Sequence, residues 1–323
     1  MRVLRRFAIA SLLAACAAGA GAQESTYPRK PVRIITAGAG TFHDIVTRQL
    51  GQRLSERWGQ PVVVENQPGA ALTIGTGIAA RATPDGYTLL MSDRSALTVA
   101  QHLYKTLQYD VARDFSPLTL TARTPSVLVA HPSVPAATLR EFVEHAKRQP
   151  GEIQIGAGGV GTASHIANEL LKQLTGINLV NVHYKGGGPQ MLAILSGEVK
   201  AGSGLVANVL PHVRAGKMKA YVVTSKERFA GAPDIPSAPE AGLPGLESEF
   251  WLGMLAPART PVALSGRLNR EMVELLQSPE MRAVLLAQGA EVASGSPEQF
   301  AAFIKSETLK WGKVIKTAGI KPE

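Results

Sequence analysis

The chain has 323 residues, of which 18% are charged and 5% are aromatic, and its formal net charge is +9. It contains no basic run and no interleaving of basic with aromatic residues, which excludes an evident nucleic-acid-binding surface. The diffuse positive charge suits the attraction of small anions, and it equally suits a surface that is merely soluble.

The first 22 residues are predicted to be a secretory signal peptide, 1–22. Three arginines among the first six residues precede an apolar run, 7–18, that is too short for a transmembrane helix and ends in small residues. Residues 20–22 fit cleavage before Gln23, whereas the segment that ends in Cys16 has the pattern of a lipoprotein cleavage site. We favour plain secretion to the periplasm and keep lipid anchoring through Cys16 as the alternative.

The mature chain is expected to rely on a large hydrophobic core. Cys16 is the only cysteine, so no internal disulfide can form once the signal is removed. About 301 residues then remain (323 − 22), enough for roughly two domains, and the net charge falls to +6 (31 − 25). No later stretch has the apolar length of a membrane span.

Short β-branched runs alternate with helical segments along the mature chain, which predicts an α/β fold with mainly parallel sheets. The first predicted helix places Ile45, Val46, Leu50, Leu54 and Trp58 on one face and ends at Gly59. A second predicted helix lies between residues 66 and 86. The predicted strands are 32–36, 62–65 and 87–91 in a first series, and 127–130, 152–155, 179–184 and 219–224 in a second.

Two extended passages, 114–132 and 235–261, separate the two series, and the tail is predicted to be helical with capping serines at Ser278 and Ser296. Because the chain passes between the two series twice, it should form two lobes, each a mainly parallel sheet flanked by helices. We call these two passages crossings, and the C-terminal segment completes the first lobe. The predicted boundaries are 23–124 plus 251–323 for lobe 1 and 125–250 for lobe 2.

Several predicted strands end in small-residue turns that open helices, at 37–43, 92–95, 156–162 and 185–189. In parallel sheets such junctions line the carboxyl edge, where open α/β proteins bind ligands. Each helix start offers unpaired N–H groups and a partial positive charge, and glycine lets the backbone approach a ligand closely. These junctions therefore have the form of anion-binding sites.

One of these junctions invites a nucleotide-binding interpretation, because Gly156, Gly158 and Gly161 form G-x-G-x-x-G. A dinucleotide fold should place an acid at the end of the next strand, roughly 20 residues on. That strand ends in "VNVHYKGGG", with Lys185 in place of a carboxylate. A cofactor is therefore not expected, although Lys185 would suit a 2′-phosphate and keeps an NADP-dependent enzyme as an alternative.

Hydrolysis is the other enzymatic alternative, and it is also disfavoured. The sequence has no G-x-S-x-G elbow, and Ser164 and His165 are adjacent at a helix start, so their side chains should point apart. Asp44 after His43 is more typical of a helix cap than of a dyad. The histidines show no metal-ligand spacing, so neither catalysis nor a metal is expected.

The sequence resembles the extracytoplasmic solute-binding receptors of tripartite tricarboxylate transporters, the Bug (TctC-like) family. The likeness covers nearly the whole mature chain, and the order and spacing of its segments are more specific than any one of them. The segments are "YPRKPVRII", "WGQPVVVENQPGA", "PDGYTLL", "LYKTLQYDVARDFSPL", "GVGTASH", "VHYKGGGPQ", "LPHVRAGKMKAYVVTS", "IPSAPEAGLPG" and "AGIKPE".

The resemblance implies a two-lobed, type II-like periplasmic binding protein that closes on a small organic carboxylate and delivers it to the membrane permease. It further implies a monomer without cofactor or nucleic acid. A sensory protein that signals to a histidine kinase is the remaining alternative. The implied ligand-binding residues are Gly38, Ala39, Gly40, Thr41, Phe42, His43, Asp44, Ser92, Asp93, Arg94, Ser95, Gly158, Gly159, Gly161, Thr162, Ala163, Ser164, His165, Tyr184, Lys185, Gly186 and Gly204.

Two departures from the family pattern bear on the ligand. The first loop reads "GAGTFHD" where the family usually has proline-glycine-glycine before the aspartate, so Phe42 and His43 add bulk and a titratable ring. After a strand at "GEV" the family tends to carry Asp-Asn, and Gly204 stands in place of the acid. We expect a plain mono- or dicarboxylate in preference to an amino acid. Arg94 is either an added cation for the ligand or a surface charge.

Overall fold

The computed structural model describes residues 27–320. The expected signal peptide, 1–22, and Cys16 lie outside the described residues. Within 27–320, no helix has both the length and the apolar character needed to cross a membrane.

The first lobe is built from strand–helix units whose strands are parallel. Strand β1 (Val32–Thr36) pairs with β2 (Val62–Asn66) on one side and with β3 (Thr88–Asp93) on the other. The aliphatic runs of β1 and β3 are mostly buried, as inner strands of a sheet covered by helices require, whereas β2 lies at the edge of the sheet and exposes Val63. The connections are α2 (Phe42–Trp58), which ends at the left-handed Gly59 as expected, and α3 (Thr73–Ala80).

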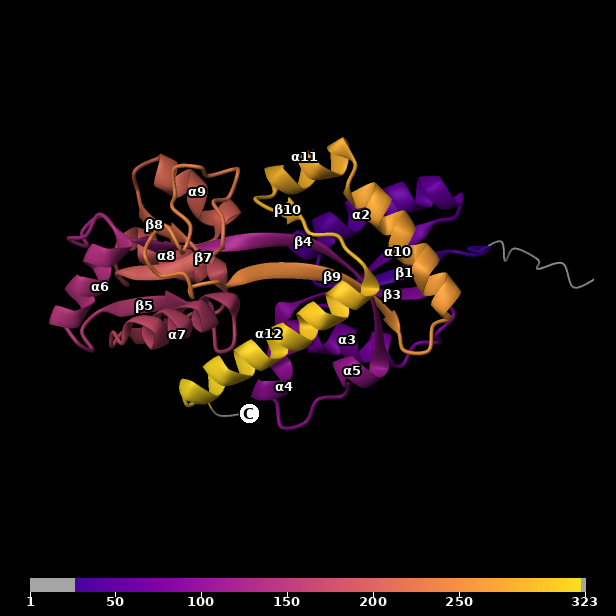
Figure 1. Cartoon of the computed structure of the whole chain (residues 1–323), viewed down its shortest axis with the longest axis horizontal. Coiled ribbons are helices and arrows are strands. Elements are labelled where there is room, and N and C mark those ends of the chain that lie inside the picture. Colours follow the sequence, from indigo (N-terminus) through magenta and orange to yellow (C-terminus); the bar gives the residue numbers. More distant parts are fainter. Residues whose placement is uncertain (1–26, 321–323) are drawn as a thin grey trace, which may run out of the picture.

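The two extended passages form long antiparallel strands that join the lobes. Strand β4 (Phe115–Ala130) pairs with β9 (Glu249–Pro257) up to Pro125 and then, from Ser126, with second-lobe strands. In Figure 1, β4 and β9 run side by side from one lobe to the other. Parallel pairing is thus confined to the strand–helix units, and these crossings make the sheet mixed.

The second lobe repeats the same construction. Strand β5 (Gln154–Ala157) pairs in parallel with β6 (Val180–His183) and β7 (Ala201–Leu205), while β7 and β8 (Lys219–Val223) pair antiparallel with β4. Over residues 27–320 the strand order is β2-β1-β3-β9-β4-β7-β5-β6, with β8 and β10 also on β4. The helices of this lobe are α6 (Leu139–Arg148), α7 (Ala163–Thr175), α8 (Gly187–Ser196) and α9 (Val206–Arg214).

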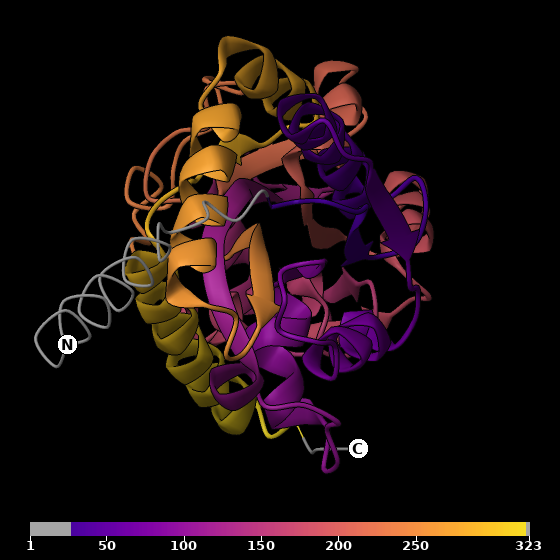
Figure 2. The same ribbon diagram turned by 90° about the vertical axis from the view of Figure 1, so that its right-hand side faces the viewer.

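The C-terminal segment contains α10 (Val262–Leu276), α11 (Pro279–Ala287), the short β10 (Glu291–Val292) and α12 (Pro297–Thr317). Ser278 and Ser296 cap α11 and α12 as predicted, the latter in a capping box. Seen end-on in Figure 2, the C-terminal helices (orange to gold) run along one side of the molecule. Helix α10 also packs against α2: Arg57 Nη1 lies 2.7 Å from Glu274 Oε2, and both helices contribute to the same first-lobe core.

Helix α12 contributes to the cores of both lobes. Phe300 and Ile304 in its first half pack in a cluster with first-lobe residues such as Ile35. Trp311, Val314 and Ile315 in its second half pack in the cluster that forms the second-lobe core. The short helix α4 (Ala100–Leu103) and the turn before it, Ser95–Val99, also reach this second core. These elements therefore tie the first lobe to the second.

The predicted α/β fold with two crossings is confirmed, with two local differences. The strand expected at "GEV" begins at Ala201 instead, because Gly197 ends α8, and Gly204 lies inside the strand rather than after it. The two-residue β10 was not predicted, since two residues carry no periodic signal.

Candidate functional site

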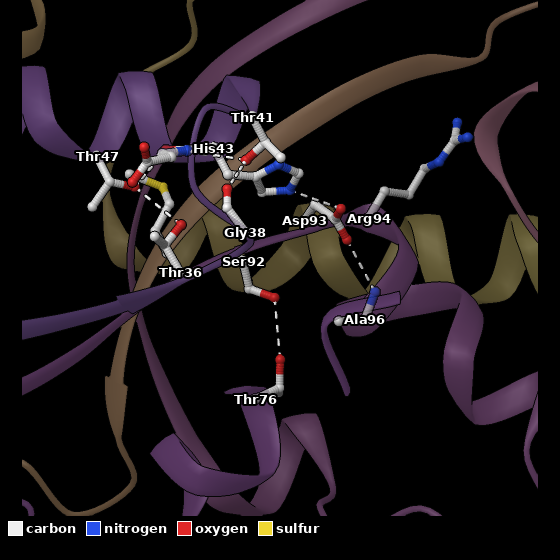
Figure 3. Close-up of polar contacts among 12 residues, drawn as sticks. Thr36, Gly38, Thr41, His43, Thr47, Thr76, Ser92, Asp93, Arg94 and Ala96 are labelled. Carbon is white, nitrogen blue, oxygen red and sulfur yellow. Dashed lines mark hydrogen bonds and ion pairs between the residues drawn. The ribbon is translucent and has the colours of Figure 1, made fainter. Parts of the chain in front are cut away.

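The loop after β1 is organised by a threonine cap and a left-handed glycine. Gly40 has φ +73°, which turns the chain into α2. The Thr41 hydroxyl donates to the Gly38 carbonyl at 2.7 Å and accepts the Asp44 N–H at 3.4 Å, and the Asp44 carboxylate accepts the Gly40 N–H at 2.9 Å. Figure 3 shows this turn above Ser92. The loop is therefore held by its own side chains and presents a helix start.

Asp44 is a positioning residue of this loop. Its carboxylate also accepts hydrogen bonds from Asn66 Nδ2 at 2.7 Å and Arg48 Nε at 2.9 Å. Burial works against ionisation, but the bonds from Arg48, Asn66 and Gly40 outweigh it and lower the pKa of Asp44. Asp44 is thus ionised and occupied by internal partners. The expected role of a helix cap is shared with Thr41, which is the N-cap itself.

The loop after β5 has the same construction with different side chains. Gly161 also has φ +73°, and the Thr162 hydroxyl donates to the Gly159 carbonyl at 2.8 Å and accepts the His165 N–H at 3.5 Å. The Nδ1 atom of His165 accepts the Gly161 N–H at 3.0 Å. Burial, with a smaller contribution from His183, lowers the pKa of His165 to about 4. His165 is therefore neutral at pH 7 and serves the loop.

The polar atoms of Ser164 and His165 have separate partners. Ser164 Oγ accepts the Gly158 N–H at 2.9 Å and lies 3.3 Å from Thr162 Oγ1, whereas His165 binds Gly161. The two adjacent side chains are engaged by different backbone groups, which agrees with the expectation that they point apart. This arrangement gives the hydrolase alternative no support.

The glycines of G-x-G-x-x-G serve contacts inside the protein. A Cβ on Gly156 would lie 3.1 Å from Gln190, and one on Gly158 would lie 3.2 Å from the Gly186 backbone. The Gly186 N–H donates to the Gly158 carbonyl at 3.0 Å. Gly156 therefore lets β5 pack closely on α8, and Gly158 lets the loops after β5 and β6 approach each other. Neither contact requires a bound pyrophosphate.

The loop after β3 is joined to the first loop through a histidine–aspartate pair. His43 Nε2 lies 2.9 Å from Asp93 Oδ2, and both side chains are largely buried. The other Asp93 oxygen accepts the Ala96 N–H at 3.1 Å (Figure 3). The His43 ring lies edge-on to Phe250, with the ring centroids 5.4 Å apart. Residues from α2, β3 and β9 thus meet at this point.

Arg94 lies in the interior, so the surface-charge interpretation is wrong. Its residue exposure is 1%, and in Figure 3 the guanidinium extends away from Asp93. Nη1 donates to Ser248 Oγ at 3.0 Å and to the Glu249 carbonyl at 3.1 Å, and the group stacks on Trp311 at 4.6 Å. Arg94 therefore connects the end of β3 to the start of β9 and to α12.

Two other predicted site residues direct their side chains to internal or separate partners, and at a third there is no room for a side chain. Ser92 is buried, with its hydroxyl 3.4 Å from that of Thr76. The Tyr184 hydroxyl donates to Glu198 at 2.8 Å, and burial together with this bond raises its pKa to about 12. A Cβ on Gly204 would lie 2.7 Å from Val209 Cγ1, so the strand there packs too closely against α9 for a side chain.

A further junction, between β2 and α3, was missed by sequence reasoning. Ala71 and Leu72 have φ values of +49° and +69°, which non-glycine residues rarely adopt and which concentrate at functional sites. Leu72 is buried in a small cluster with Ala37 and Ala96, which belong to the loops after β1 and β3. Its position in the sequence could have identified it, because this segment also joins a parallel strand to a helix.

The two glycine–threonine loops lie where the lobes contact each other. A Cβ on Gly161 would lie 2.1 Å from Cδ1 of Leu103, a residue of α4. Ala163 and Leu205 of the second lobe pack against the same first-lobe core as Phe42. Both helix starts, α2 and α7, therefore border one interface, and their first-turn N–H groups have no intrahelical acceptor.

Comparisons with known proteins agree with this architecture. BugT from Bordetella pertussis is 33% identical over 99% of each chain. The structure of R. palustris Rpa4515 with adipate is 30% identical, with a TM-score of 0.81 over 92% of this chain and 100% of that one. MatC from Rhodopseudomonas palustris with bound malate is 30% identical, with a TM-score of 0.75 over 90% of this chain and 100% of that one.

The family comparison covers both lobes. Residues 46–320 match the model for the "Tripartite tricarboxylate transporter family receptor" (TctC). This range runs from the first turns of α2 to the last described residue and so includes the junctions after β2, β3, β5 and β6. The chain belongs to the TctC family of tripartite tricarboxylate transporter receptors, whose members are periplasmic solute-binding proteins.

Proposed function

We propose that this receptor closes on a small organic carboxylate and delivers it to the permease of a tripartite tricarboxylate-type transporter. The observation that carries the proposal is the duplicated loop. Each lobe presents a helix start behind a left-handed glycine and a threonine cap, and the two starts border the same interface. Helix starts of this kind favour anions through their free N–H groups and partial positive charge.

Magnitudes indicate that both lobes are needed. Micromolar affinity corresponds to about 8 kcal/mol, whereas one helix start contributes roughly 0.3 to 1 kcal/mol, or about 2 kcal/mol when partly buried. Hydrogen bonds to a charged group add about 1.5 to 3 kcal/mol each. Donors from Gly38–Asp44 and from Gly158–His165 must therefore converge on the ligand, which makes closure of the lobes and binding one coupled event.

The relatives indicate the ligand class. The structures solved with adipate and malate belong to chains that match this one over their full length. We extend the carboxylate ligand class to this chain and propose that the loops after β1, β2, β3 and β5 hold the ligand.

The proposal also includes export through the signal peptide, a monomeric state, and lobes bounded at 23–124 plus 251–323 and 125–250. Within this scheme Arg94 acts at the lobe connection and does not contact the ligand.

A thermal-shift screen with carboxylates tests the proposal. Protein expressed with its own leader and purified should gain melting temperature with at least one carboxylate, by the amount that RT ln(1 + [L]/Kd) requires. Mass spectrometry after prolonged incubation should return the ligand unchanged. Stabilisation by NADP and by no carboxylate, or conversion of the ligand to a product, would contradict a transport receptor. Binding that activates a histidine kinase in the absence of transport would favour a sensory protein.

A further inference from the structure

Four apolar side chains near the two glycine–threonine loops belong to the first-lobe core or pack against it. Phe42 and Ala163 are the first residues of α2 and α7, directly after the capping threonines, while Leu205 ends β7 and Phe250 lies near the start of β9. Phe250 belongs to the first-lobe core, and the other three are partly buried against that core. The rings of Phe42 and Phe250 are 6.3 Å apart. Both lobes thus contribute apolar side chains at their interface, and these four side chains are called the apolar surface below.

The cations of the first-lobe loops already have partners. Arg48 is paired with Asp44 at 2.9 Å, and the buried Arg94 guanidinium donates to two neutral groups, Ser248 Oγ and the Glu249 main-chain carbonyl. His43 is paired with Asp93, so this pair has a net charge of zero when the imidazole is protonated and −1 when it is neutral. In either state these loops expose no unpaired positive side chain to a second carboxylate, because Arg94, which has no ion-pair partner among the described residues, is only 1% exposed.

The second lobe adds one exposed cation at this edge, Lys185, which follows β6. At the end of β7, Gly204 has no side chain and Leu205 is apolar. The main-chain N–H groups of the loops suffice for one carboxylate. A second carboxylate placed against the apolar surface, and not beside Lys185, would lose its water without an equivalent partner, which is unfavourable. A hydrocarbon body would gain from the same burial.

We propose that this receptor selects monocarboxylates with an apolar body over dicarboxylates of the same carbon skeleton, with Phe42, Leu205 and Phe250 as the specificity-determining residues. The inference rests on the proposed carboxylate-binding function. It sets this chain apart from the relatives that were solved with adipate and malate, both of which are dicarboxylates.

Calorimetric titration of matched pairs tests the inference. The pairs are butanoate and succinate, hexanoate and adipate, and benzoate and terephthalate. In each pair for which binding is measurable, the monocarboxylate should bind at least tenfold more tightly to the wild-type protein. Leu205→Asn keeps the branched shape and the number of non-hydrogen side-chain atoms but makes the side chain polar, and it should weaken monocarboxylate binding at least fivefold. The same change at Leu192, which is 68% exposed on α8, should leave the affinity unchanged.

Three results would overturn the inference. One is equal or tighter binding of the dicarboxylates. Another is a selective loss of dicarboxylate affinity in Lys185→Met, which would show that Lys185 holds a second carboxylate. The last is an unchanged affinity in Leu205→Asn, provided that the ligand-free melting temperature shows a folded variant. Each of these leaves the carboxylate receptor intact, whereas failure of all six compounds and of the wider carboxylate screen would reject the proposed function itself.

Discussion

Asp44 and His165 occupy equivalent positions in two different loops. Each is the third residue of its helix, and each accepts the N–H of the glycine that precedes the capping threonine, at 2.9 and 3.0 Å respectively. One loop is thus held by a carboxylate and the other by an imidazole. The charge of Asp44 is offset by Arg48, and His165 is neutral at pH 7. Neither residue therefore gives its loop a net charge, and the backbone dominates the attraction for an anion.

The low pKa of His165 predicts a pH dependence of stability. Its value of about 4 lies below the ordinary 6.5, so between these values the unfolded chain binds a proton that the folded protein does not. Stability from this residue is therefore fully present above about pH 6.5 and is lost as the pH falls toward 4, by about 2 to 3 kcal/mol. Denaturant titrations across this range should show the loss.

His165→Asn provides the matched test, because the asparagine oxygen can still accept the Gly161 N–H while the side chain no longer titrates. This variant should flatten the profile between pH 4 and 6.5. The same change at His212, a partly exposed residue in the last turn of α9, should leave the profile unaltered. If His165→Asn retains the wild-type slope, the pH dependence has another origin.

Gly161 and Gly176 allow the effect of backbone conformation to be separated from that of closure. Both are left-handed, at φ +73° and +70°, but an added Cβ meets Leu103 at 2.1 Å in the first case and nothing within 4 Å in the second. Alanine at either position should cost about 1 to 2 kcal/mol of folding stability. Only Gly161→Ala should also weaken ligand binding, by tenfold or more, because the lobes cannot approach fully.

A second variant checks the cause of that loss. Shortening the opposing side chain in the double variant Gly161→Ala, Leu103→Ala should restore most of the affinity, as measured by calorimetry. Affinity that stays low in the double variant would instead assign Gly161 to direct contact with the ligand. The interface contact would then be incidental.

The parts of the fold that follow from local pattern were predictable, and those that depend on tertiary packing were not. The aliphatic run Val32–Thr36 and the terminator Gly59 indicated β1 and the end of α2. Strand β7 has no such run, because Gly202 and Gly204 make room for Ile194 and Val209, and these contacts are invisible in the sequence.

The candidate site shows the same division. The threonine caps and glycine turns are local, so the loops after β1 and β5 could be identified as junctions. The direction of the Arg94 side chain depends on Ser248 and Trp311, which are more than 150 residues away in the chain. A charged residue after Asp93 therefore looked like a candidate for the surface or the ligand, although it is held in the interior between β3, β9 and α12.

Removal of the Arg94 side chain should affect stability more than ligand preference. Arg94→Met keeps the length of the side chain but loses the bonds to Ser248 and Glu249 and the stacking on Trp311, so we expect a loss of about 2 to 4 kcal/mol. Arg140→Met, at a side chain that is 85% exposed on α6, should be nearly neutral. Folded Arg94→Met should rank ligands as the wild type does, and a folded variant without carboxylate binding would make Arg94 a ligand contact.

Ala71 and Ala80 offer a test of strain at the junction between β2 and α3. Ala71 is exposed at φ +49°, a conformation that favours glycine, whereas Ala80 is the last residue of α3. Ala71→Gly should therefore raise the free energy of unfolding by up to about 1 kcal/mol, while Ala80→Gly should lower it by about 0.5 to 1 kcal/mol. Chemical denaturation of both variants measures the difference in sign. Equal destabilisation would show that the surrounding loops, and not the backbone of Ala71, carry the strain at this edge of the site.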